Sequence, residues 1–321
     1  MKKSFLLAAV AVAALSSCTN EATVATPKAA APAEQTLTFT ATSDAATRSG
    51  IDAAAMKSFW SAKDAIAVFR ASVTNGMNTA KKFTCNAAEG DATTTFTGSI
   101  APDETGYTAV HPYIGGGWGT VASISVTQQQ SPVAGSLDSN CDILWCKSEG
   151  FTLKFKRMVA VVNIILKNAP ETIQGEKVKK LTFESTTGGF TGGYTSIDVT
   201  DGTVNPQDYS SYGEMYAIYA INKNIIANYT DETGYVINGE ANTMLASYPT
   251  TIEAGSTLTI TAQTDHYTMT KTATVGEAPI ELVANKVVTF NVDLSTSTST
   301  VVSSLDEAGT EDPNDGGQYD I

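Results

Sequence analysis

Short segments of alternating apolar and polar side chains are the feature that most restricts the fold of this sequence. In residues 287–294, Val288, Phe290, Val292 and Leu294 all fall on one side of an extended chain, because residues two apart share a face of a β-strand. Comparable runs recur along the sequence between glycine-containing turns, and no helical period persists beyond about two turns. The pattern predicts an all-β fold, with one short helix at Asp52–Ala62.

The strand-like segments fall into two groups that meet near residue 150. Shorter segments precede this point, and longer ones begin at Phe151. We therefore expect two tandem β-sandwich domains of transthyretin-like or Ig-like Greek-key type, at residues 49–150 and 151–294. Within the second group the apolar phase slips by one residue after Lys156-Arg157, which predicts either a β-bulge or a strand that is buried on both faces.

The N-terminal segment has the pattern of an export signal. Two lysines precede the apolar run Phe5 to Leu15, and Leu15-Ser16-Ser17 leads into Cys18. The run is about half the ~20 residues that a membrane-spanning helix needs. Residues 1–17 are therefore predicted to be a lipoprotein signal peptide and Cys18 the lipidated residue, which places the protein outside the cytoplasm. An ordinary secretory signal with an incidental cysteine is the alternative.

Residues 18–48 are predicted to form a tether followed by one strand. The tether is rich in small residues and proline, so it has little with which to build a core. In the strand, Leu37, Phe39 and Ala41 share one face and threonines occupy the other. Arg48 follows in a loop of polar and small residues, where a trypsin-like protease could cut before Ser49. Alternatively, Arg48 is an ordinary solvent-exposed arginine and not a cleavage site.

Composition excludes several classes of function. The net charge is -13 and the sequence pI is about 4.6, which argues against a nucleic-acid partner. There are two histidines, and neither a Gly-x-Ser-x-Gly elbow nor a Gly-Lys-Ser/Thr phosphate loop occurs. We therefore expect no enzyme activity, no cofactor and no metal. Cys85, Cys141 and Cys146 are expected to be buried, inert thiols.

Six local patterns occur in order along the chain. They are Leu15 to Cys18; Phe39-Thr40-Ala41 with Thr47-Arg48-Ser49; Trp60 to Phe69; Tyr107 to Tyr113; Asp142 to Trp145 with Leu153 to Ala160; and Val288 to Leu294. Together they resemble the fimbrillins, the pilin family of Bacteroidales type V pili. The chain departs from the family pattern at Lys63, where glycine is usual, and at Arg157, where histidine is usual.

The resemblance implies a structural pilin subunit of a cell-surface fimbria that supports adhesion. The lipoprotein would reach the outer membrane through its lipid, and cleavage after Arg48 would remove the strand that carries Leu37, Phe39 and Ala41. Residues 295–321 would form an extended C-terminal donor appendage that fills the vacated groove of another copy or of a related pilin. Its inward side chains would be Val301, Ser303 and Leu305, or Val302 in the other phase.

Other surface roles remain open at this stage. A fimbrial tip adhesin could bind host proteins or glycans, with tyrosines that stack on sugars: Tyr194, Tyr209, Tyr212, Tyr216 and Tyr219. An anchor subunit would keep its lipid because Arg48 stays uncut. A glycan-binding surface lipoprotein unrelated to pili is a further alternative.

Overall fold

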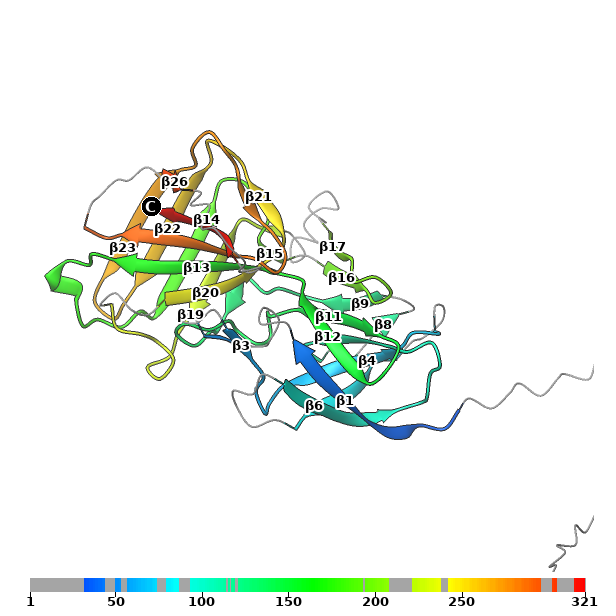
Figure 1. Ribbon diagram of the computed structural model, residues 1–321. Coiled ribbons are helices and arrows are strands. Elements are labelled where there is room, and N and C mark those ends of the chain that lie inside the picture. The colour runs from blue at the N-terminus through cyan, green and yellow to red at the C-terminus, as the bar shows by residue number, and fades with distance from the viewer. Residues whose placement is uncertain are drawn as a thin grey trace, which may run out of the picture. The chain divides into compact units, whose positions relative to one another are not determined.

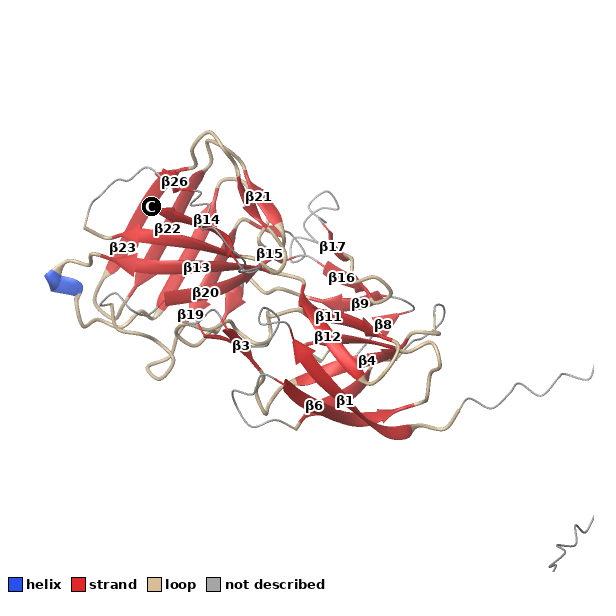
Figure 2. Cartoon of the chain, viewed as in Figure 1, coloured by secondary structure: helices blue, strands red, loops and turns tan. Residues whose placement is uncertain are grey.

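The protein is described by a computed structural model. It describes residues 32–43, 50–52, 57–73, 79–86, 93–113, 115, 117–118, 121–192, 194–207, 221–237, 242–295, 302–304 and 315–320. Strands dominate these residues, and the one helical element among them is a 3₁₀ turn, η1, at Glu171–Ile173 (Figure 2). The predicted all-β class is confirmed. In the described part of the chain, no helix is long and apolar enough to cross a membrane.

The first group of strands closes into a barrel (Figure 1). Its alternating apolar residues point into one core. In spatial order its strands are β1 (Gln35–Ser43), β12 (Thr152–Arg157), β11 (Leu144–Ser148), β7 (Tyr107–His111), β4 (Ala65–Arg70), β5 (Lys81–Cys85) and β6 (Thr93–Ile100).

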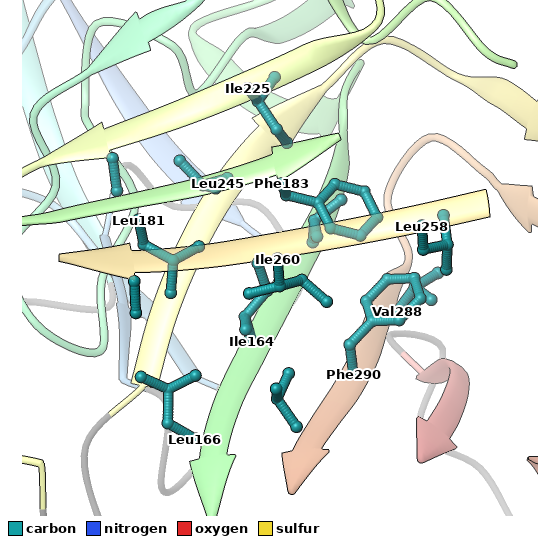
Figure 3. Packing of buried hydrophobic residues seen from close by; sticks show 14 of the residues in the cluster. Ile164, Leu166, Leu181, Phe183, Ile225, Leu245, Leu258, Ile260, Val288 and Phe290 are labelled. Carbon is teal, nitrogen blue, oxygen red and sulfur yellow. The ribbon is translucent and has the colours of Figure 1, made fainter. Parts of the chain in front are cut away.

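The second group forms two sheets that enclose a shared apolar core. Figure 3 shows Phe183 and Ile260 from one sheet near Ile164 and Phe290 from the other. One sheet runs β10 (Gln129–Gln130), β19 (Asn224–Asn228), β14 (Lys180–Ser185), β22 (Thr257–Gln263) and β23 (Thr268–Thr274). The other runs β20 (Asn242–Ser247), β13 (Ala160–Lys167), β25 (Val287–Asp293), β27 (Asp315–Asp320) and β26 (Val302–Ser304).

The chain passes from the barrel to the second group between Arg157 and Ala160. β12 belongs to the barrel, although its residues lie beyond the predicted division at residue 150. A further core joins the two groups, since it contains Phe69 of β4 together with Val161 of β13. The phase slip marks this passage, and β13 is buried on both faces because Val162 packs in the other core. The division into two separate domains stays a prediction.

Small sheets complete the described fold. One spans both groups in the order β17 (Val204–Gln207), β16 (Tyr194–Asp198), β9 (Val121–Ile124) and β8 (Gly117–Trp118). Three pairs are β2 (Gly50–Asp52) with β3 (Lys57–Phe59), β15 (Thr191–Gly192) with β18 (Ile221–Asn222), and β21 (Thr250–Ile252) with β24 (Ile280–Leu282). The predicted short helix at Asp52–Ala62 is wrong, because its described residues pair as strands.

The described parts of the C-terminal appendage lie on an edge of the second group. β27 pairs in parallel with β25, and Phe290 is the register partner of Tyr319. β26 pairs antiparallel with β27, from Val302 opposite Asp320 to Ser304 opposite Gln318. In this arrangement the appendage extends the sheet of its own chain.

Candidate functional site: the strand that closes the barrel

β1 closes the barrel by pairing with two strands that are distant in sequence. It runs antiparallel to β6, from Gln35 opposite Ile100 to Thr42 opposite Thr93. Its second half runs parallel to β12, and this pairing begins where the Thr40 N–H donates to the Phe151 carbonyl at 2.8 Å. Figure 1 shows β1 (blue) beside β6. In a barrel without β1, β6 and β12 would keep their other neighbours, β5 and β11, but each would present one unpaired edge to the gap.

The inward face of β1 is part of the barrel core. Phe39 and Ala41 are fully buried, and Leu37 is partly buried against the same cluster. The ring of Phe39 lies 5.3 Å from that of Phe83, 5.0 Å from Tyr107 and 5.6 Å from Phe151, measured between centroids. We call these three partners the aromatic cage. The predicted inward positions of this strand agree with the structure.

Phe151 forms the rim of the aromatic cage. It is 55% exposed, which is unusual for a large apolar side chain that also contacts a fully buried ring. It lies between β11 and β12, and its carbonyl accepts the hydrogen bond from Thr40. Phe151 thus contacts β1 through both its ring and its backbone, at the side of the cage that is open to solvent.

The outward face of β1 is polar and matches its neighbour. The hydroxyls of Thr38 and Thr97 lie 3.1 Å apart, and those of Thr36 and Ser99 lie 3.4 Å apart. Such cross-strand pairs of hydroxyl residues each contribute roughly 0.2–1 kcal/mol. A strand that occupies the place of β1 therefore needs apolar residues at alternate positions and tolerates polar residues between them.

A buried charged cluster lies at one end of the barrel strands, and the sequence did not reveal it. Arg157, the last residue of β12, donates from Nε to Asp142 Oδ1 at 2.6 Å and from Nη2 to Oδ2 at 3.0 Å. His111, the last residue of β7, has Nδ1 2.9 Å from the Asp142 carbonyl oxygen and Nε2 3.5 Å from Asp64 Oδ1. The Ser61 N–H donates to the other oxygen of Asp64 at 2.7 Å.

The electrostatics of this cluster act on His111. Burial works to lower the pKa of its imidazole, but the hydrogen bond and negative charge of Asp64, with further help from Asp142, outweigh burial and raise the pKa above its usual value. The ring also makes an edge contact with Trp60 at 5.8 Å. The cluster is buried, and its ion pair and hydrogen bonds tie the ends of β7 and β12 to Asp142.

The predicted site residues are only partly described. Cys18, Arg48, Ser49, Val301 and Leu305 lie outside the described residues. Val302 and Ser303 lie in β26, which pairs with β27. The two described candidates, Val302 and Ser303, therefore lie in the sheet of β25 and β27 and not in the barrel of their own chain. Tyr194 lies in β16, and the other tyrosines of the adhesin alternative are outside the described part.

The thiols among the described residues are buried and form no disulfide bond: Cys85, Cys141 and Cys146. Burial raises the pKa of Cys141 to about 11, and burial also raises the pKa of Cys146 well above its usual value. The described residues contain no group of three or more histidine, cysteine or acidic side chains placed to hold a metal ion.

A sequence model of the fimbrillin-like family matches residues 45–305. The chain belongs to the fimbrillin-like family. The resemblance inferred from the local sequence patterns is confirmed. The family match begins after β1 and covers the other barrel strands, the second group of strands and the start of the appendage.

Solved structures similar to this fimbrillin-like chain come from Bacteroides and Porphyromonas. A candidate cell adhesion protein from Bacteroides uniformis is 15% identical, with 81% of this chain and 93% of that chain covered and a TM-score of 0.48. A fimbrial protein from Bacteroides vulgatus is 12% identical, with 81% of this chain and 96% of that chain covered and a TM-score of 0.38. The C-terminally truncated tip fimbrial protein Mfa3 from Porphyromonas gingivalis is 8% identical, with 77% of this chain and 83% of that chain covered and a TM-score of 0.34. No curated protein sequence matches this chain.

Proposed function

We propose that this fimbrillin-like protein is a structural subunit of a cell-surface pilus that assembles by strand exchange. Membership of the family supports a pilus role. The observation that carries the assembly mechanism is the position of β1, which fills the barrel core with Phe39 and Ala41 and pairs with both β6 and β12. Among the described strands, β1 alone precedes Arg48, so a single cut after Arg48 would separate this strand from the rest.

Maturation would begin with export of a lipoprotein. Lipid on Cys18 would hold the precursor at the outer membrane, with β1 in place so that the core stays covered. Cleavage between Arg48 and Ser49 would then separate β1 from the rest of the chain. Loss of the fully buried Phe39 alone is worth about 3–5 kcal/mol, by analogy with phenylalanine truncation in protein cores. The cleaved barrel would therefore bind a replacement strand strongly.

The replacement strand would come from the C-terminal appendage of a second subunit. An extended segment can supply main-chain hydrogen bonds to β6 and β12, while its alternate side chains fill the core. Val301, Ser303 and Leu305 are the donor side chains expected from the sequence, with Val302 for the other phase. Because each subunit would receive at one place and donate from another, assembly is head to tail and forms a filament.

Cleavage at Arg48 gives the direct test. Cells that produce the full chain should release polymer on shearing, visible as a ladder in mild detergent, while Arg48→Ala should leave lipidated monomer in the membrane. Arg48→Lys is the matched control, because a trypsin-like protease also cuts after lysine. Polymer from Arg48→Ala cells at the wild-type level would refute strand removal by cleavage at Arg48. A wild-type chain that stays a lipidated monomer would instead favour the lipid-retaining anchor role.

A further inference from the structure

The groove that β1 fills accepts side chains of a particular size at each inward position. Its centre is the aromatic cage, which holds the buried ring of Phe39. On one side the groove takes only the methyl group of Ala41, which is fully buried, and on the other it takes Leu37, which is partly exposed. The matching donor pattern is therefore small, aromatic and aliphatic at alternate positions.

Most of the appendage does not fit this pattern. Aligning Val301 to Leu305 with the groove puts Ser303 in the aromatic cage, and the phase set by Val302 puts either Ser304 or Val302, a smaller side chain than phenylalanine, there. A serine in the cage would leave most of it empty and would also bury a hydroxyl among aromatic rings. In residues 295–321 the one aromatic residue is Tyr319, and its neighbours two positions away are Gly317 and Ile321.

On the basis of the strand exchange proposed above, we propose that the donor is the segment Gly317–Ile321 of a second copy, with Tyr319 in the aromatic cage. Gly317 takes the place of Ala41 and Ile321 that of Leu37. This size match requires the donor to run opposite to β1, and hence antiparallel to β12. The other direction would force Ile321 into the space of the Ala41 methyl group, and overpacked cores are destabilised.

The length of the appendage favours this segment. The residues that would link the second group of strands to a donor at Gly317–Ile321, 295–316, would reach about 70 Å when extended. The corresponding link to a donor that starts at Val301, residues 295–300, would reach about 20 Å. Asp315–Asp320 is already a strand, β27, beside β25 of its own chain. The described donor residues, Gly317–Asp320, therefore have the extended conformation that insertion needs, and their place in the sheet of their own chain would be given up on exchange.

The hydroxyl of Tyr319 needs a hydrogen-bond partner, and the rim of the cage provides access to water. Phe151 is 55% exposed, so solvent reaches this side of the cage. Tyr319→Phe should therefore assemble at least as well as wild type. Truncating a buried aromatic side chain lowers an equilibrium constant by about two powers of ten or more. Tyr319→Ala should therefore weaken assembly on the order of a hundredfold.

Site-directed crosslinking in polymer from cells that make the full chain tests both the segment and its direction. Thr152 on β12 is exposed and lies opposite Thr40 of β1. In the proposed direction Gln318 replaces Thr40, so Thr152→Cys should form intersubunit disulfides with Gln318→Cys. Bonding to Asp320→Cys instead would overturn the proposed direction.

Matched variants separate this inference from the proposed function. In the polymer, Ser304→Cys should not form a disulfide with Thr152→Cys. If Leu305→Ala abolishes the ladder while Tyr319→Ala does not, the donor segment is wrong but strand exchange stands. Failure of the wild-type chain to form any ladder would overturn both. The melting temperature of each uncleaved precursor checks that the variants fold.

Discussion

Arg157 and Asp142 form a buried, two-bond ion pair at the end of β12, with N–O distances of 2.6 and 3.0 Å. Arg157 is the final residue of the strand that borders β1, and Asp142 precedes β11. The pair therefore fixes the β12 side of the groove independently of β1. This matters for strand exchange, because a receiving barrel must keep its shape while the groove is empty.

Breaking this pair should destabilise the precursor strongly. Asp142→Asn leaves the Arg157 guanidinium buried without its counter-charge, which costs about 3–5 kcal/mol in comparable buried pairs. Urea unfolding of the precursor measures the loss. The double variant Asp142→Leu with Arg157→Met is the control and should recover much of the stability. A loss below about 1 kcal/mol for Asp142→Asn would contradict the role assigned to this pair.

His111 should make barrel stability depend on pH. Its pKa is raised in the folded state, so the stabilisation is fully present below the unfolded pKa of about 6.5 and is lost as pH rises through the folded pKa. The groups that face it are Asp64, the carbonyl and carboxylate of Asp142, and the Trp60 ring. The stability difference between wild type and His111→Gln should shrink as pH rises. A difference that grows would contradict the assignment.

Gly98 should be intolerant of a side chain because it lies behind the aromatic cage. A Cβ atom at this position would be 2.5 Å from the Lys82 carbonyl oxygen and 2.7 Å from the Phe83 ring. Gly98→Ala should therefore displace Phe83 and lower the free energy of unfolding by about 1–3 kcal/mol. Gly276→Ala is the control, since its Cβ would meet nothing within 4 Å, and should change stability by less than about 0.5 kcal/mol.

Cys141 and Cys146 should be unreactive in the folded protein. Burial raises the pKa of Cys141 to about 11, so near pH 8 it holds about two orders of magnitude less thiolate than an exposed cysteine. Alkylation with iodoacetamide, followed by mass spectrometry of peptides, should label both residues only after unfolding. Rapid labelling of either thiol in the native precursor would contradict the burial described for it.

Local alternation was enough to predict part of the strands and, in β1, the inward face. Phe39 and Ala41 are buried as expected, since side-chain direction in a strand follows directly from a period of two. The phase slip after Arg157 was also informative, because β13 is indeed buried on both faces, with Val161 and Val162 in different cores. These features depend on residues that are close in sequence.

Long-range pairing could not be predicted in this way. Nothing local indicates that Thr40 lies beside Thr152, or that the barrel takes β12 from beyond residue 150. Arg157 gave no sign of burial either, because its partner Asp142 belongs to another strand connection and the pairing depends on the tertiary fold. The sequence likewise could not place the end of the appendage beside β25.

The N-terminus of the assembled subunit tests the central proposal most directly. Polymer sheared from cells that make the full chain can be analysed by intact mass and N-terminal sequencing. Strand exchange predicts a chain that starts at Ser49, without lipid and without β1. A polymer whose subunits still begin at lipidated Cys18 would contradict the proposal, because β1 would then still occupy the groove.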